Sequence, residues 1–143
     1  MKNIRTSLAL TALFLLFAFS SALGQTQRQT VNIPFNFTAG EKAFKAGRYV
    51  IERNQKNADI VWSIQNKETG ARTVVLTRPV YTAETQERSK LIFHRYADLY
   101  FLAEFYSAGS NIGRELQISN REKALDKALA QQREIITLTE RGR

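Results

Sequence analysis

The sequence of 143 residues contains no cysteine, two prolines and a single histidine, His94. Internal repeats and low-complexity tracts are absent as well. Without cysteine no disulfide can form, so packing must stabilise the fold, although an oxidising compartment would be tolerated. The same absence removes the residue that carries the lipid of a bacterial lipoprotein, and we exclude that class. One histidine likewise excludes a metal site built from several histidines.

The N-terminus carries the features of a secretory signal peptide. Two cations, Lys2 and Arg5, precede the uncharged apolar run 8–19, and small residues follow it up to Gly24. We therefore expect a signal peptide over residues 1–24 and a secreted or periplasmic mature chain. The alternative is an uncleaved anchor, but the run is shorter than the ~20 apolar residues that a spanning helix needs.

The expected mature chain, residues 25–143, is basic and long enough for one domain with a real core. Without Lys2 and Arg5 it keeps 19 basic residues against 13 acidic ones, a net charge of +6. For an exported protein this charge favours an anionic envelope surface or another envelope protein as the partner. Nucleic acid is not expected, although charge alone would permit it.

Alternating apolar residues predict four strands in the first half of this chain, near 31–38, 48–53, 60–65 and 71–79. Pro34 cannot donate to a strand ladder, so the first strand should lie at a sheet edge or bulge there. In the fourth strand, Val74 and Leu76 should face opposite to Val75. The side chains expected to point inward in the first three strands are Val31, Ile33, Phe35, Phe37, Tyr49, Ile51, Ile60, Trp62 and Ile64.

The segment 90–106, KLIFHRYADLYFLAEFY, predicts a central hairpin with a turn at Ala97-Asp98. Its return strand, 99–106, is apolar on both sides. Such a strand is usually covered on both faces, so we expect it in the middle of the sheet. Period two places Leu91, Phe93 and Arg95 on one face of the first strand, and Leu99, Phe101, Ala103 and Phe105 on one face of the second.

A helix is predicted near residues 119–133, after an exposed connection at 80–89, the hairpin and a Gly-rich loop at 107–114. Ser119 and Glu122 have the spacing of a capping box. The apolar side of this helix should close the open side of the sheet, and it comprises Leu125, Ala128, Leu129 and Gln132. A membrane-surface or partner-binding role for the helix is the alternative. The β-branched run 135–139 predicts a last strand.

These elements predict a mainly β fold, an antiparallel sandwich or flattened barrel of six or seven strands with one C-terminal amphipathic helix. Residues 25–143 form one domain in this prediction. The sequence does not predict an oligomeric state.

Two motifs resemble a known group of exported proteins. The line IPFNFTAGEKAFKAGRYVIER and the later hairpin KLIFHRYADLYFLAEF are similar to small exported acidobacterial proteins of unknown function, which show Ile-Pro-Phe-x-Phe followed by Ala-Gly-x-Tyr. The chain departs from this pattern at Lys45, where the group usually has proline. The shared positions are strand and turn positions, so the resemblance implies an exported β-rich fold and no established activity.

Few residues are candidates for chemistry. His94 is more often a packed or surface residue than a ligand, and the near pairs Glu84/Glu87 and Glu104/Glu115 lie in or beside predicted loops without an evident aromatic pocket. Loop 107–114 lacks the spacing of a phosphate-binding loop. The sequon at Asn36 would be idle in a bacterium, and the aromatic residues are expected in the core and not as a base-stacking platform. We predict no catalytic residues, no metal ligands and no cofactor.

Two functions from different classes remain open. The first is an exported, non-enzymatic interaction or structural module of the envelope or the extracellular space. The alternative is a carrier of small apolar ligands inside a β-barrel, and an enzyme ranks third. A closed aromatic core favours the module, whereas a cavity of roughly several hundred Å³ favours the carrier.

Overall fold

The computed structural model describes residues 27–54 and 59–140. The expected signal peptide lies outside the described residues. The described part holds ten strands, one α-helix and a short 3-10 helix, whose bounds are β1 Arg28–Ile33, β2 Phe37–Ala39, β3 Lys42–Phe44, β4 Gly47–Arg53, β5 Val61–Asn66, β6 Arg72–Tyr81, β7 Lys90–Tyr96, β8 Leu99–Tyr106, β9 Ile112–Leu116, α2 Asn120–Leu129, η1 Ala130–Gln132 and β10 Arg133–Thr139.

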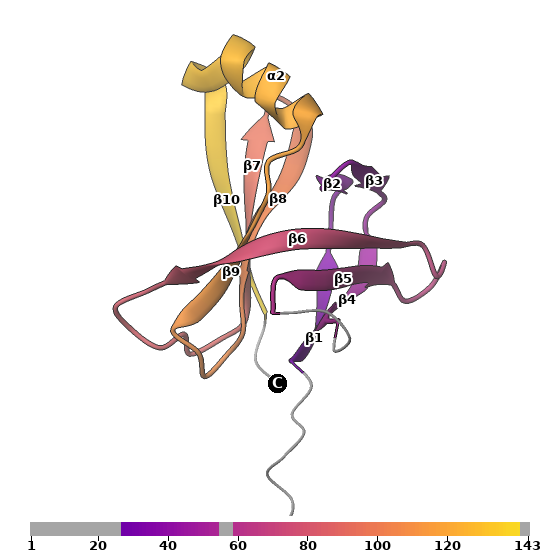
Figure 1. Ribbon diagram of the computed structural model, residues 1–143. Coiled ribbons are helices and arrows are strands. Elements are labelled where there is room, and N and C mark those ends of the chain that lie inside the picture. The colour runs from indigo at the N-terminus through magenta and orange to yellow at the C-terminus, as the bar shows by residue number, and fades with distance from the viewer. Residues whose placement is uncertain (1–26, 55–58, 141–143) are drawn as a thin grey trace, which may run out of the picture.

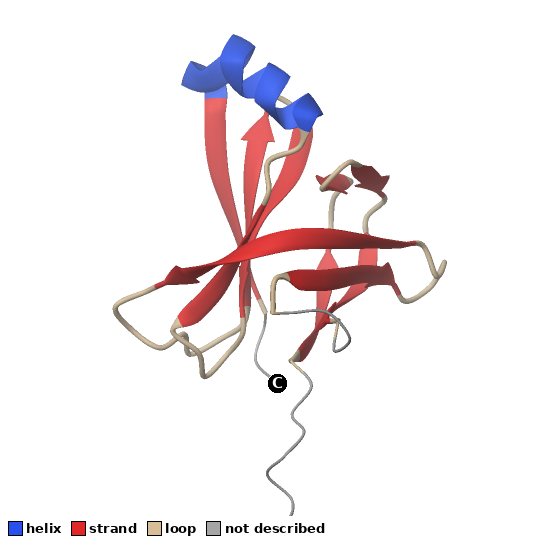
Figure 2. Ribbon diagram, viewed as in Figure 1, coloured by secondary structure: helices blue, strands red, loops and turns tan. Residues whose placement is uncertain are grey.

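The strands form one bent sheet with the order β1-β4-β5-β6-β9-β8-β2-β3, and β7 joins β8 to β10 (Figure 1). Neighbouring strands are antiparallel except β2 and β8, which are parallel. Strand β6 connects the two halves of the sheet, because its first half pairs with β5 and its second half with β9. Figure 2 shows that strands dominate the chain and that α2 lies across one end of β7, β8 and β10.

The predicted mainly β fold with one C-terminal helix is confirmed, and the described strands number ten where six or seven were expected. One added strand arises because the chain leaves the ladder at Pro34, which divides the predicted strand 31–38 into β1 and β2. As expected for a strand that precedes this proline, β1 is an edge strand. Two further segments outside the predicted strands also pair as strands: 42–44, and 112–116, which begins inside the predicted loop 107–114.

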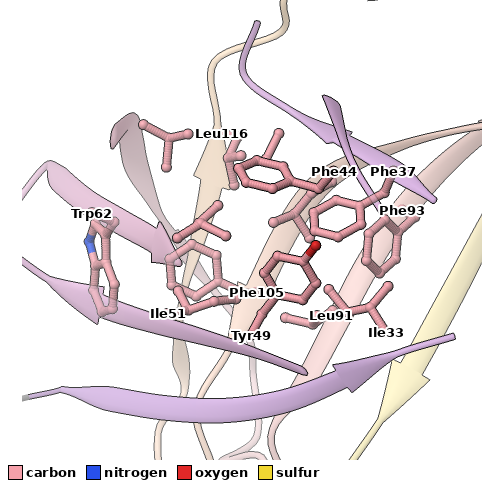
Figure 3. Packing of buried hydrophobic residues seen from close by; sticks show 14 residues of the cluster. Ile33, Phe37, Phe44, Tyr49, Ile51, Trp62, Leu91, Phe93, Phe105 and Leu116 are labelled. Atoms are coloured by element: carbon pink, nitrogen blue, oxygen red, sulfur yellow. The ribbon is translucent and has the colours of Figure 1, made fainter. Parts of the chain in front are cut away.

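Aromatic side chains fill the space between the two halves of the sheet (Figure 3). Phe37 packs edge-on against Tyr49 and Phe93, with ring centroids 5.0 and 5.7 Å apart, and Trp62 packs against Phe105 at 4.8 Å. Most of the expected core residues are in this cluster, but the prediction for Ile60 is wrong because its side chain is 48% exposed. Ile60 precedes β5 and lies in a turn, so the alternation of that strand does not reach it.

The predicted faces of the central hairpin are wrong in one half of β8. The pairing with β7 steps from Ile92 opposite Glu104 to Phe93 opposite Leu102, so Ala103 forms a bulge. Leu102 and Phe105 therefore both face the main core, although they are an odd number of residues apart. Phe101 lies on the other face of the sheet.

Helix α2 begins as predicted but buries a different side. Ser119 is the N-cap, and its hydroxyl accepts a hydrogen bond of 3.1 Å from the Glu122 backbone N–H. However, Glu122 is the buried residue of this helix, whereas Leu125 and Leu129 are half-buried. The expected apolar contact is thus a polar one. No helix in the described segments has the length and hydropathy needed to cross a membrane.

The last predicted strand is confirmed. Residues 133–139 form β10, which pairs antiparallel with β7 and ends the sheet on that side. Ile136 and Leu138 pack against the core, while Ile135 is 64% exposed on the outer side. The alternation of this strand therefore follows the period of two that its sequence indicates.

Trp62 provides the most direct test of the core. Its side chain is 2% exposed, and its indole N–H donates a hydrogen bond of 3.0 Å to the Asp59 carbonyl. We expect Trp62→Ala to lower the free energy of unfolding by about 3–5 kcal/mol, the range for deleting a large buried aromatic side chain. Denaturant titration measures it, with exposed Val74→Ala as the control, for which we expect a change within about 0.5 kcal/mol. A loss below about 1 kcal/mol for Trp62→Ala would show that its strand face is misplaced.

Gly113 leaves room for an aromatic ring on the neighbouring strand. Tyr106 lies directly opposite it, and a Cβ at position 113 would collide with the Tyr106 ring. We expect Gly113→Ala to cost about 1–3 kcal/mol of unfolding free energy, as overpacking does. In a Tyr106→Ala background the same change should cost much less. Equal costs in both backgrounds would mean that the ring does not set the requirement for glycine.

Candidate interaction surface

The outward side of β6 presents apolar residues to solvent. Along this strand Val75 and Thr77 point into the protein, so the alternating positions point outward. Val74 and Leu76 are 53% and 52% exposed, and Arg72 and Arg78 flank them on the same side. The prediction that Val74 and Leu76 face opposite to Val75 is confirmed. We call Arg72, Val74, Leu76 and Arg78, together with the adjacent Ile118, the β6 face.

Two open hollows extend along β6 beside the segment that follows β9. Their volumes are about 390 and 320 Å³, and both are lined by Leu76, Gln117 and Ile118. The segment between β9 and α2 forms one wall, and it is held against β6 by a 3.2 Å hydrogen bond from the Gln117 N–H to the Leu76 carbonyl. Ile118, 38% exposed, adds to the apolar area. Contiguous exposed apolar side chains with a polar rim are typical of interaction sites.

Cations dominate the rim of the β6 face. Arg78 donates a 2.6 Å hydrogen bond to Glu115 on β9, which raises the pKa of its guanidinium, yet the Arg78 side chain is 76% exposed. Arg72 donates to the Ser63 hydroxyl at 2.9 Å, and Lys42 donates to the Arg72 carbonyl at 2.7 Å. Both residues are exposed. The guanidinium groups are therefore positioned by neighbours while most of their surface faces solvent.

Each hollow also has one carboxylate on its rim. Glu115 lines the larger hollow, while Glu41 and the exposed Lys123 line the smaller one. Glu41 is engaged with the helix end, because its carboxylate accepts a 2.9 Å hydrogen bond from the Asn120 N–H. Lys123 adds a fourth cation, after Arg72, Arg78 and Lys42, beside Val74 and Leu76.

The structure brings Glu104 and Glu115, which were predicted in or beside loops, directly opposite each other on β8 and β9. Each carboxylate has a different partner: Tyr106 donates to Glu104 at 2.6 Å, and Arg78 to Glu115. Burial raises the pKa of Tyr106, and its hydrogen bond to Glu104 adds to that shift. Because each carboxylate is held by its own hydrogen-bond donor, Glu104 and Glu115 can lie side by side on neighbouring strands. Glu104 lines neither hollow on the β6 face.

The other sequence candidates lie apart from the β6 face. Glu84 and Glu87 are exposed in the connection between β6 and β7. In loop 107–114, the N–H groups of Gly109 and Ser110 donate to the Gln86 and Ser107 carbonyls, so they do not form an anion cradle. The described residues contain no group of three or more His, Cys, Asp or Glu side chains that could hold a metal ion.

His94 belongs to a polar contact that joins α2 to the sheet. Its Nδ1 lies 2.7 Å from Glu122 Oε1, and the two side chains are 19% and 5% exposed. On the same face Tyr96 donates a 2.9 Å hydrogen bond to Asp126, one helical turn beyond Glu122. We call these four residues the helix contact. The i, i+4 spacing of Glu122 and Asp126 was the available signal, but acidic residues on a helix usually indicate a solvated side.

No protein-family model matches this chain, and comparisons with curated proteins and with solved structures find no match.

The helix contact predicts a loss of stability at high pH. Burial raises the pKa of Tyr96 from 10.0 to about 12, and the hydrogen bond to Asp126 contributes in the same direction. The neutral phenol is thus favoured in the folded chain, so its contribution is complete below pH 10.0 and is lost as the pH rises toward about 12.

The measurement is the unfolding free energy across this pH range for the wild type and Tyr96→Phe. We expect a shallower decline for Tyr96→Phe, because the variant cannot ionise at this position. Tyr106→Phe is the companion variant: because the pKa of Tyr106 is also raised, this change should remove a separate part of the decline at high pH. An unchanged slope in Tyr96→Phe would contradict the assignment.

Proposed function

We propose that this chain is an exported, non-enzymatic interaction module that associates with anionic surfaces of the cell envelope. The observation that carries the proposal is a basic surface around a filled core. The net charge of residues 25–143 is +6, and the interior between the two halves of the sheet is occupied by packed aromatic side chains. The chain therefore combines a net positive charge with an interior that packed side chains occupy.

The filled interior supports the module over the carrier. A carrier needs an enclosed apolar cavity, commonly about 300–1,000 Å³. Here Phe37, Tyr49 and Phe93 meet ring to ring in the middle of the fold. The two hollows of comparable size lie along β6 beside the segment 117–118, and both are open to solvent.

The distribution of charge supports attraction by the whole domain. Residues 114–143 hold seven basic and five acidic side chains, a net charge of +2 out of +6. Basic residues are thus spread over both halves of the chain. Summed long-range attraction of this kind acts over a Debye length of about 8 Å at physiological ionic strength, so it should weaken strongly with salt.

Cosedimentation with lipid vesicles tests the proposal. We expect the mature chain to bind vesicles containing anionic lipid at low salt, to ignore neutral vesicles, and to dissociate by about 0.5 M salt, where the screening length is about 4 Å. Binding that is independent of lipid charge, or unchanged at high salt, would contradict the electrostatic account. If the chain does not bind anionic vesicles at low salt, the proposal fails, and the basic charge serves only to keep the protein soluble.

A further inference from the structure

We propose that the β6 face is the surface through which the chain contacts an anionic lipid bilayer. Val74 and Leu76 would enter the headgroup layer, and Arg72 and Arg78 would bind lipid phosphates. The inference rests on the proposed function and adds to it a defined orientation. It differs from diffuse attraction, in which every cation contributes alike. Here Arg72 and Arg78 should contribute more to binding than cations elsewhere on the chain.

Three apolar side chains, Val74, Leu76 and Ile118, are exposed close together on this surface. Val74 and Leu76 alternate on one strand, and Ile118 lines both hollows beside them. Val61, half-buried, lies directly opposite Leu76 on β5 and extends the patch. In Figure 1, β6 runs across the middle of the view, with β5 and β9 as its neighbours. Side chains that alternate on one side of a strand can meet the same surface together.

The charges on this face are complementary to anionic lipid. Arg72 and Arg78 stand at the two ends of the apolar strip, and Lys42 and Lys123 lie beside it. Against these four cations are the carboxylates of Glu41 and Glu115. Arginine presents a planar set of donors that fits phosphate oxygens, and its exposed groups here can reach them without refolding.

The shape of the site selects a bilayer over a small anion. A free phosphate is held by donors that converge in a pocket, whereas Arg72 and Arg78 are separated by the apolar pair. A bilayer interface offers phosphate groups and apolar chains side by side, which matches the alternation of the strand. An acidic protein is the other possible occupant, and the test below distinguishes it.

Two other apolar features are less suited to this role. On α2, Leu125 and Leu129 are half-buried and Ala128 is small. On β10, Ile135 is 64% exposed, but its outward neighbours on the same strand are Arg133 and Thr137, and neither continues an apolar strip. Ile135 therefore provides a matched control of greater exposure than Leu76.

The test measures binding to vesicles of mixed anionic and neutral lipid at fixed low salt. Each cation near an anionic membrane contributes about 1 kcal/mol, so Arg72→Gln with Arg78→Gln should weaken binding by about twenty- to thirtyfold. The control pair, Arg88→Gln with Lys127→Gln, removes the same charge from exposed positions that line neither hollow. We expect it to weaken binding by less than about fivefold.

The apolar arm compares Leu76→Ser with Ile135→Ser. We expect about a fivefold loss for Leu76→Ser, because half of a leucine side chain would no longer be removed from water, and no loss for Ile135→Ser. All substituted positions are exposed, and unfolding curves confirm that each variant is folded. The two arms are independent, so a folding defect in one leaves the other decisive.

The outcomes separate the two proposals. If the wild type does not bind anionic vesicles, the proposed function fails and the orientation fails with it. A second outcome is that the wild type binds, the two double variants bind equally weakly, and Leu76→Ser binds like the wild type. The proposed function then stands, but the β6 face is not the surface that contacts the bilayer. In that case this face serves another occupant, such as an acidic protein.

Discussion

The fold depends on covering both faces of β8. Five of its eight residues are buried, and no single apolar layer could bury side chains that point in opposite directions. The main core covers Leu102 and Phe105, and the face toward α2 covers Phe101, which meets Tyr96 ring to ring at 5.9 Å. The bulge at Ala103 allows this division, because it moves the strand by one position between the two halves.

Because of this arrangement, strand β6 has one side in the core and one side exposed to solvent. It must pair with β5 in one half of the sheet and with β9 in the other, so its ten residues cross the whole fold. Its inner side supplies Val75 to the core. Helix α2 is engaged at the end of β7, and Val74 and Leu76 on the outer side of β6 remain half exposed. The same connectivity that closes the core therefore leaves an apolar strip beside cations.

Much of the fold could be predicted from the sequence, because alternation reports directly on a sheet with one buried side. Alternation identified the central hairpin and the outward placement of Val74 and Leu76, and Pro34 indicated the edge position of β1. The bulge at Ala103 could not be predicted, since it is a property of pairing between two strands. The placement of Glu104 opposite Glu115 could not be predicted for a related reason, because it depends on the pairing of β8 with β9, a strand that begins inside the predicted loop 107–114. The helix contact was missed because the side chains that α2 contributes to it, Glu122 and Asp126, are acidic.

The most direct measurement of how the chain contacts a surface is a fluorescent label at one position. The sequence has no cysteine, so Leu76→Cys and Ile135→Cys each create a single labelling site, one on the β6 face and one on β10. With a polarity-sensitive dye and anionic vesicles, the label at position 76 should report transfer to an apolar environment, while the label at position 135 should remain in water. Equal responses at both positions, or a response at 135 alone, would contradict the proposed orientation.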